Sequence, residues 1–166
     1  MSRGFVKEGD QEETPIIPPR AALPNNAVNY VTPKGLELLK LEREQLEMQR
    51  DGLESINEQQ RRVDLGVLQG KMDLLNERIR TARVLQLKEQ PQDEVRFGAT
   101  VSYRILPSNN VQQFQIVGVD EADIRKKKIA FVAPIAVALT GHKTGEKFLF
   151  QLGSETKEIE VLKIEY

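Results

Sequence analysis

The chain has 166 residues, which is enough for one domain with an extension or for two small domains. Its 24 basic residues balance 25 acidic residues, so net charge does not favour binding to nucleic acid or to an anionic membrane. It contains no cysteine, which excludes disulfides, thiolate metal sites and a cysteine nucleophile. No apolar run approaches the roughly 18 residues that span a bilayer, and the N-terminus lacks the apolar region of a signal peptide. We therefore expect a soluble, cytoplasmic protein.

Residues 1–30 combine charged and polar side chains with four prolines, a composition that disfavours a helix. We expect a disordered N-terminal extension. The alternative is an arm that docks Ile16 and Ile17 on the body of the protein or on a partner.

Residues 31–86 carry two stretches with the hydrophobic spacing of a coiled coil, which predicts an antiparallel helical hairpin. The first arm runs from Thr32, a capping residue, to about Ile56, and the second from about Gln59 to Leu85. Glycines should weaken both helices, each by up to about 1 kcal/mol relative to alanine. The apolar seam consists of Leu39, Leu46 and Leu53 in the first arm and Leu65, Leu68, Met72, Leu75, Ile79 and Ala82 in the second.

Residues 87–94 contain a proline and no periodicity, which indicates a linker. Beyond it the hydrophobic period becomes two, starting with a predicted strand from Val95 to Ile105. Residues 95–166 are therefore predicted to form a compact domain with a curled antiparallel sheet of about five strands and one short helix. The further strands are expected over residues 111–119, 128–133, 146–152 and 156–166, and the helix over residues 134–139. The whole chain is predicted to have an α+β fold.

Catalytic constellations are missing from the sequence. His142 is the single histidine, and a lone exposed histidine is more often a surface residue than a base or ligand. The glycine-rich run from Gly141 to Lys147 lacks the spacing of a phosphate-binding loop. We expect no metal site, no cofactor and no enzymatic activity of the chain's own.

Several short motifs follow one another in a fixed order in the second half of the chain, and one begins the first arm. They are Val31-Thr-Pro-Lys-Gly35, Leu38-Leu39, Phe97-Gly-Ala-Thr-Val101, Ile116-Val-Gly-Val-Asp-Glu-Ala-Asp123, Ile129, Pro134-Ile-Ala136, Ala138-Leu139, Gly141, Gly145 and Ile164-Glu-Tyr166. Over residues 31–166 this series resembles the GreA/GreB transcript-cleavage factors. The resemblance implies an N-terminal coiled coil followed by an FKBP-like domain.

The resemblance also implies a partner and a mode of action. Factors of this family bind bacterial RNA polymerase at its secondary channel, and acidic residues at the hairpin tip help to hold Mg²⁺ in the polymerase active site near the nascent RNA. No membrane or small-molecule substrate is implied. The candidate polymerase-binding residues are Asp120, Glu121, Ala122, Asp123, Pro134, Ile135 and Ala136. The alternative for this set is structural, with Asp120 and Asp123 capping a turn and residues 134–136 packing the short helix.

The hairpin tip departs from the family. The pattern Gly-Asp-x-x-Glu-Asn of the cleavage factors is absent between residues 33 and 85. The tip candidates are Glu54, Asn57 and Glu58, and the two glutamates would share a face if the helix persisted across them. The alternative is that they are ordinary solvated carboxylates. Each arm is also shorter than in the family by two turns, about 11 Å.

Three functional hypotheses follow from the sequence. The first is an elongation regulator that binds RNA polymerase and stimulates cleavage of backtracked RNA. The second is a non-cleaving or inhibitory binder of the secondary channel, like the short-hairpin relatives of the Rnk type. The third is a prolyl isomerase, suggested by the FKBP-like fold alone, although the chain lacks tryptophan for an aromatic proline pocket.

Overall fold

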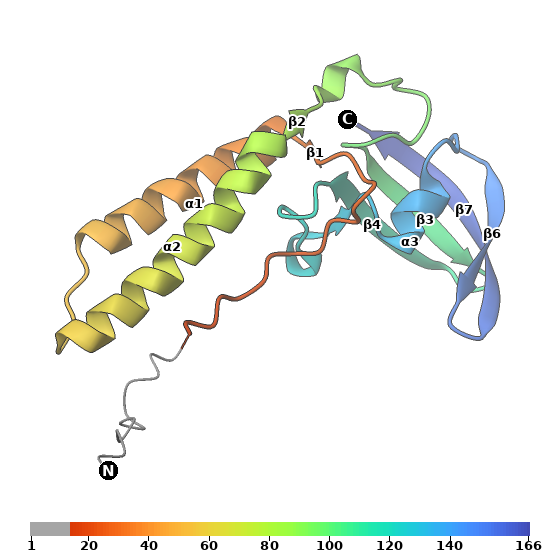
Figure 1. Cartoon of the computed structure of the whole chain (residues 1–166). Coiled ribbons are helices and arrows are strands. Elements are labelled where there is room, and N and C mark those ends of the chain that lie inside the picture. The colour runs from red at the N-terminus through yellow and green to blue at the C-terminus, as the bar shows by residue number, and fades with distance from the viewer. Residues whose placement is uncertain (1–13) are drawn as a thin grey trace, which may run out of the picture.

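The computed structural model describes residues 14–166 of the chain. A helical hairpin projects from a small sheet-containing domain, and a segment without regular secondary structure runs beside the hairpin (Figure 1). The expectations for residues 1–13 lie outside the described residues. The architecture is α+β, as predicted.

The hairpin consists of α1, Pro33–Asp51, and α2, Glu58–Thr81. Thr32 caps α1, because its hydroxyl accepts a hydrogen bond from the Gly35 amide at 2.9 Å. The predicted seam is confirmed at its centre, where one buried cluster joins the two arms. This cluster contains Val31, Leu39, Leu46, Leu68, Met72 and Leu75. Among the described residues, no helix combines the length and apolar character that a membrane span needs.

The helix ends differ from the prediction at both arms. Helix α1 ends at Asp51 instead of near Ile56, because Gly52 caps it and its amide donates back to the carbonyls of Met48 and Arg50. Helix α2 ends at Thr81 instead of Leu85, because the following residues form a strand.

Two short strands tie the hairpin together at its root. They are β1, Tyr30–Val31, and β2, Arg83–Val84, which pair in parallel. The Arg83 amide donates to the Asn29 carbonyl at 2.8 Å, and the Leu85 amide donates to the Val31 carbonyl at 3.0 Å. The chain therefore enters α1 and leaves α2 at the same place.

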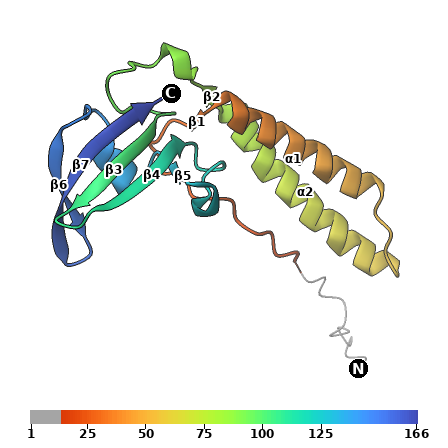
Figure 2. The same cartoon turned by 180° about the vertical axis from the view of Figure 1, so that it is seen from behind.

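The domain behind the hairpin is built on one curled sheet (Figure 2). Within residues 14–166 this sheet has five strands in the order β5-β4-β3-β7-β6. The elements are η1, Leu87–Glu89, β3, Thr100–Leu106, β4, Asn110–Val117, η2, Ile124–Lys126, β5, Lys128–Ala130, α3, Pro134–Leu139, β6, Lys147–Leu152, and β7, Glu155–Glu165.

The predicted antiparallel sheet is confirmed for the pairs β3–β4, β3–β7 and β6–β7, and the structure departs from it at one edge. Strands β4 and β5 pair in parallel, with Ile116 opposite Ile129. A parallel pair needs a crossover instead of a tight turn, and the segment 118–127 with η2 supplies it. The left-handed Lys127, with φ 56°, returns the chain to the sheet edge.

The first predicted strand begins five residues late. Val95, Phe97 and Ala99 are buried, as their alternation predicted, but β3 starts only at Thr100. Gly98 has a φ of 90°, a backbone conformation that a strand does not allow. The alternation thus identified the buried side chains but not the backbone conformation.

An aromatic cluster joins the root of the hairpin to the sheet domain. The rings of Tyr30, Phe97 and Phe131 pack against one another with centroids 5.6–5.8 Å apart, partly edge to face. Gly118 lets the backbones approach here, since a Cβ at this position would lie 2.6 Å from the Tyr30 carbonyl oxygen. The position of β1 on the sheet domain therefore depends on a side chain being absent at residue 118.

Substitution Gly118→Ala tests this close approach. We expect it to lower the free energy of unfolding by about 1–3 kcal/mol, because β1 must move away from the sheet domain to admit the methyl group. Urea denaturation followed by circular dichroism measures the change. Gln113→Ala, at an exposed position of β4, is the control and should shift the value by less than about 0.5 kcal/mol. An equally small effect of Gly118→Ala would contradict the proposed contact.

Candidate functional site

The hairpin tip is the loop of residues 52–57 between α1 and α2. Asn57 caps α2 through its side-chain oxygen, which accepts from the Gln60 amide at 2.8 Å, and Glu58 occupies the first helical turn. Glu54 lies in the loop and not in a helix. Glu54, Asn57 and Glu58 are all exposed. The condition under which Glu54 and Glu58 would share one helix face is therefore not met.

Asp64 fastens the loop to α2. Its carboxylate accepts one hydrogen bond from the Ser55 hydroxyl at 3.1 Å and another from the Gln60 side-chain amide at 2.9 Å. Asp64 and Glu54 line the same open hollow of about 560 Å³ beside the tip. The sequence reasoning missed Asp64, although its spacing of four from Gln60 is a known helix pair.

The apex presents an apolar side chain to solvent. Ile56 is 98% exposed, whereas its neighbour Ser55 is turned back toward Asp64. Across residues 14–166, no group of three or more histidine, cysteine, aspartate or glutamate side chains is arranged to hold a metal ion. The described tip thus offers carboxylates that form no group of three, together with one exposed isoleucine.

The second region of interest is the segment after β4, where four candidate binding residues follow one another. Glu121 is buried, and its carboxylate accepts the Thr32 hydroxyl at 2.8 and 2.9 Å. A Cβ at Gly35 would lie 3.2 Å from the same carboxylate. The negative charge therefore sits at the N-terminus of α1, where the helix dipole favours it. The Lys128 Nζ lies 3.6 Å from the Glu121 Oε1.

Asp120 points in a different direction and forms two ion pairs. Its carboxylate lies 3.0 Å from the Arg20 Nε and 3.4 Å from an Arg78 guanidinium nitrogen. Only 6% of the Asp120 side chain is exposed. The structural alternative expected Asp120 to cap a turn. Its carboxylate instead connects the sheet domain to α2 and to the N-terminal segment.

The remaining candidates divide between exposed and packed positions. Asp123 caps η2, because its carboxylate accepts from the Arg125 amide at 3.0 Å. Ala136 is fully buried in the core and Ile135 packs partly against it. Ala122 and Pro134 are the two exposed members of the predicted set. The candidate polymerase-binding residues thus lie on two elements, the crossover after β4 and helix α3. Most of their side-chain polar atoms face the interior of the protein.

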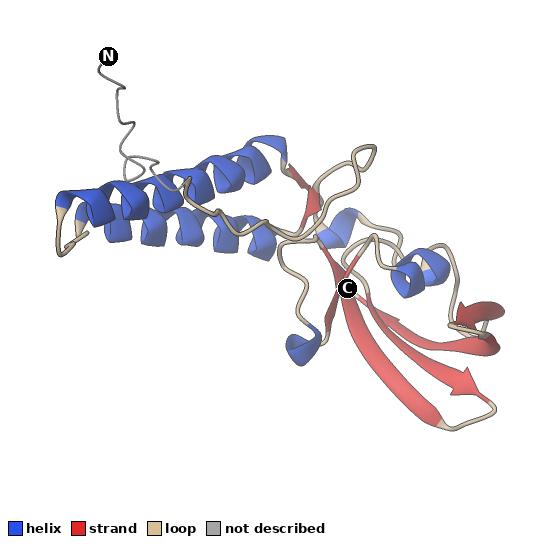
Figure 3. Ribbon diagram, turned by 60° about the horizontal axis from the view of Figure 1, so that its bottom comes forward, coloured by secondary structure: helices blue, strands red, loops and turns tan. Residues whose placement is uncertain are grey.

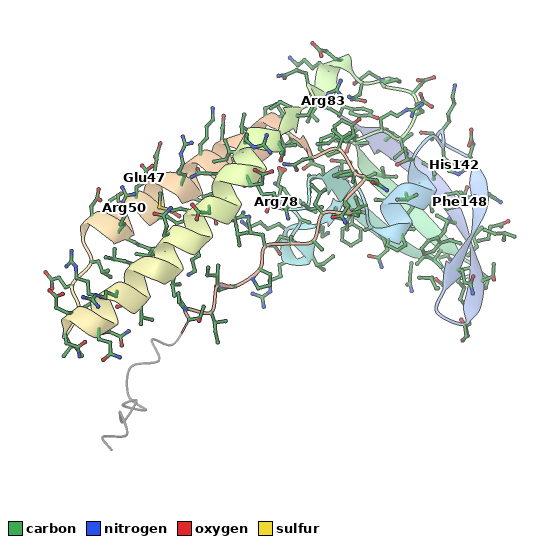
Figure 4. The ribbon with its side chains drawn as sticks, viewed as in Figure 1. Glu47, Arg50, Arg78, Arg83, His142 and Phe148 are labelled. Carbon is green, nitrogen blue, oxygen red and sulfur yellow. The ribbon has the colours of Figure 1, made fainter. Side chains whose placement is uncertain are left out.

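His142 is held in place by a stacked ring and a hydrogen bond within the sheet domain. Its ring stacks on Phe148 with centroids 4.3 Å apart, and its Nδ1 lies 2.8 Å from a Glu146 carboxylate oxygen. This hydrogen bond to His142 holds the pKa of Glu146 below its usual value. Both rings lie in the sheet domain, on the side away from the hairpin (Figure 4).

Replacing Glu121 tests its position at the hairpin root. Glu121→Ala should lower the free energy of unfolding by about 1–3 kcal/mol, because the buried Thr32 hydroxyl loses its acceptor. Thermal and urea unfolding measure the loss. Glu158→Ala, at an exposed position of β7, should change stability by less than about 0.5 kcal/mol. If Glu121→Ala and Thr32→Ala are additive in the double variant, the two side chains are not coupled and the assignment fails.

Sequence comparison identifies relatives of the chain. Residues 90–166 match the family model described as "Transcription elongation factor, GreA/GreB, C-term". The chain is 36% identical over 101 residues to the transcription elongation factor GreA of Pelobacter propionicus, a stretch that covers 61% of this chain and 64% of that relative. It is 30% identical over 152 residues to GreA of Neisseria meningitidis serogroup A, which covers 82% of this chain and 96% of the relative.

Two solved structures are similar to the chain at low sequence identity. GreA factor homolog 1 of Thermus thermophilus has 18% identity and a TM-score of 0.40, with 84% of this chain and 100% of that chain covered. GreA/GreB from Nitrosomonas europaea has 20% identity and a TM-score of 0.41, with 84% and 99% covered. These superpositions are loose, so the assignment rests on the sequence matches. By those matches, the chain belongs to the GreA/GreB family of transcription elongation factors.

Proposed function

We propose that this protein is a bacterial regulator of transcription elongation that binds RNA polymerase at the secondary channel. The observation that supports it most is the projecting hairpin, whose arms of 19 and 24 residues are fixed at the root and free at the tip. An α-helix of 19 residues is about 28 Å long. A rod of this kind suits insertion into a channel better than packing within a globular core.

In this proposal, the exposed members of the candidate polymerase-binding residues contact the polymerase directly. Ala122 and Pro134 offer apolar contact area on the crossover and on α3. Asp120, Glu121 and Asp123 would act indirectly, because their carboxylates already accept hydrogen bonds or form ion pairs within the chain. In this proposal their role is to fix the crossover in the shape that the partner recognises.

The chemistry would belong to the polymerase. The factor would work in the cytoplasm as an accessory protein with no catalytic activity or cofactor of its own. Any effect on RNA cleavage would act through Mg²⁺ in the polymerase active site, with indirect contact to the nascent RNA.

The tip favours a second candidate, a channel binder that does not stimulate cleavage. Supporting an additional Mg²⁺ requires carboxylate oxygens within about 2.0–2.6 Å of the ion. Here Asp64 is held by Ser55 and Gln60, and Glu54 and Glu58 are separated by the turn into α2. Ile56 projects at the apex instead. Such a tip could occupy the channel without delivering a carboxylate pair.

A cleavage assay separates the two versions. Stalled, backtracked complexes of the cognate polymerase are incubated with Mg²⁺, with and without this protein, and RNA products are resolved on gels. We expect binding in a pull-down without faster cleavage, because Glu54 lies in the loop, Glu58 lies in α2, and no group of three possible metal ligands forms at the described tip. Absence of binding would overturn the whole proposal. Acceleration by about tenfold or more would overturn the non-cleaving version, and its loss in Glu54→Ala/Glu58→Ala would assign the activity to those residues.

Competition provides an independent measurement. At saturating concentration this protein should suppress cleavage stimulated by an authentic GreA, because both would occupy the same channel. Titrating the chain against a fixed amount of GreA measures the effect as loss of cleaved RNA. Lys147→Ala, at an exposed position of β6, the edge strand opposite β5, serves as the matched control variant. Unchanged cleavage at saturation would contradict occupancy of a shared site.

A further inference from the structure

Residues 14–29, here named the N-terminal strap, lie along the hairpin and lead into β1 (Figure 3). The strap has no regular secondary structure, yet it makes specific contacts at several points. It contains four prolines, which restrict the backbone to extended conformations before any contact forms. Such a segment loses little further conformational entropy when it docks.

Two glycines of α2 receive the apolar part of the strap. Gly66 and Gly70 are four residues apart and therefore lie on one face of the helix. A Cβ at Gly66 would lie 3.0 Å from Pro15 Cγ, and a Cβ at Gly70 would overlap Ile17 Cδ1. Ile17 contacts the helix in this way and is 37% exposed, whereas Ile16 is 89% exposed. The glycines that weaken α2 are thus the places where the strap approaches its backbone.

Arg20 connects the strap to both parts of the molecule. Its guanidinium donates to the two carboxylate oxygens of Glu42 on α1, at 2.7 and 3.0 Å. Its Nε also donates to Asp120 in the crossover after β4, at 3.0 Å. A bidentate pair fixes the direction of the guanidinium plane as well as its distance. One side chain therefore bridges the hairpin and the sheet domain.

Arg78 reinforces this bridge from α2. It pairs with Asp120 and donates to the Ala21 carbonyl of the strap. Figure 4 shows Arg78 on the side of α2 that faces the strap. The side chains of Arg20 and Arg78 are only 17% and 14% exposed. The ion pairs are therefore less screened by salt than surface pairs would be.

The surroundings of Arg20 favour the charged form of its guanidinium. The hydrogen bond to Glu42 and the attraction of Asp120 raise the pKa of Arg20 above its usual value, although partial burial opposes the shift.

The strap also forms one wall of a cleft of about 430 Å³. The other walls come from α1, α2 and the crossover, including Leu46, Leu74 and Val119.

We propose that the Gly66–Gly70 face, together with Glu42 and Asp120, is a receptor surface for an extended segment with an apolar residue three positions before an arginine. Its resident occupant is the chain's own strap, seated through Ile17 and Arg20. While the strap is bound, it fixes the angle between the hairpin and the sheet domain; when it leaves, the angle is released and the cleft opens. This inference concerns the free protein and does not depend on the proposed function.

Trypsin cleavage of the Arg20–Ala21 bond reports strap release, because Arg20 must leave its carboxylate partners to enter the protease. Mass spectrometry follows the rate at low protease concentration. Gly70→Ala should speed this cleavage by about tenfold or more, since the new methyl group displaces Ile17, although alanine is the better helix former. Ile17→Ala/Gly70→Ala should cleave more slowly than Gly70→Ala, because the shorter side chain makes room again.

Gln69→Ala, at the exposed neighbouring position of α2, is the matched control and should cleave like the unchanged chain. Circular dichroism establishes that α2 is retained in each variant. Equal cleavage rates in Gly70→Ala and the unchanged chain would show that the strap is not seated on Gly70. The same conclusion would follow if the double variant were no slower than Gly70→Ala.

Distances between spin labels test the angle directly. The chain has no cysteine, so labels at Asp51→Cys near the tip and Ser154→Cys in the β6–β7 turn are free of background. The unchanged strap should give one narrow distance distribution, and Arg20→Glu or the milder Arg20→Ala should broaden it. Lys40→Glu, an exposed charge reversal on α1, should leave it narrow. A distribution unaffected by both Arg20 variants would overturn the proposal.

Sedimentation separates the intramolecular strap from an exchanged one. We expect a monomer whose cleavage rate at Arg20 is independent of protein concentration. A dimer that requires Ile17 and Arg20 would show that the surface binds the strap of a second copy, and would overturn the assignment of the occupant.

Discussion

One buried carboxylate holds the root of the hairpin against the sheet domain. Glu121 accepts the Thr32 hydroxyl and lies against the first turn of α1, where Gly35 leaves room for it. A buried negative charge is stable only with compensation, and here the helix N-terminus and Lys128 provide it. The neighbouring Asp120 turns toward the strap and α2 instead. Two consecutive acids therefore hold the hairpin from two directions.

Local sequence patterns predicted those features that depend on neighbours along the chain. The Thr32–Pro33 start of α1, the apolar seam and the buried faces of the sheet follow from capping and periodicity, and the structure has all three. The parallel pairing of β4 with β5, and of β1 with β2, depends on contacts between distant segments. Periodicity within one strand contains no information about the direction of its partner.

The candidate site shows the same division. The sequence identifies Asp120 and Glu121 as candidate binding residues, but their burial cannot be read from it, because their partners Arg20 and Thr32 lie 100 and 89 residues away. Helix propensity alone assigns the glycines at 35, 66 and 70 only a cost to helix stability. Each instead allows a close approach by Glu121, Pro15 or Ile17. At these three positions, a glycine within a helix marks a close contact, and only the tertiary structure identifies the residue on the other side of that contact.

The parallel pairing of β1 with β2 has a consequence for how such a protein can vary. Because these strands pair at the root, the two ends of the segment 32–82 are fixed relative to each other. Inserting or deleting seven residues in each arm at the outer end would preserve the apolar seam and leave the root unchanged. The length of the hairpin can thus change without altering the contacts at its root that set its orientation.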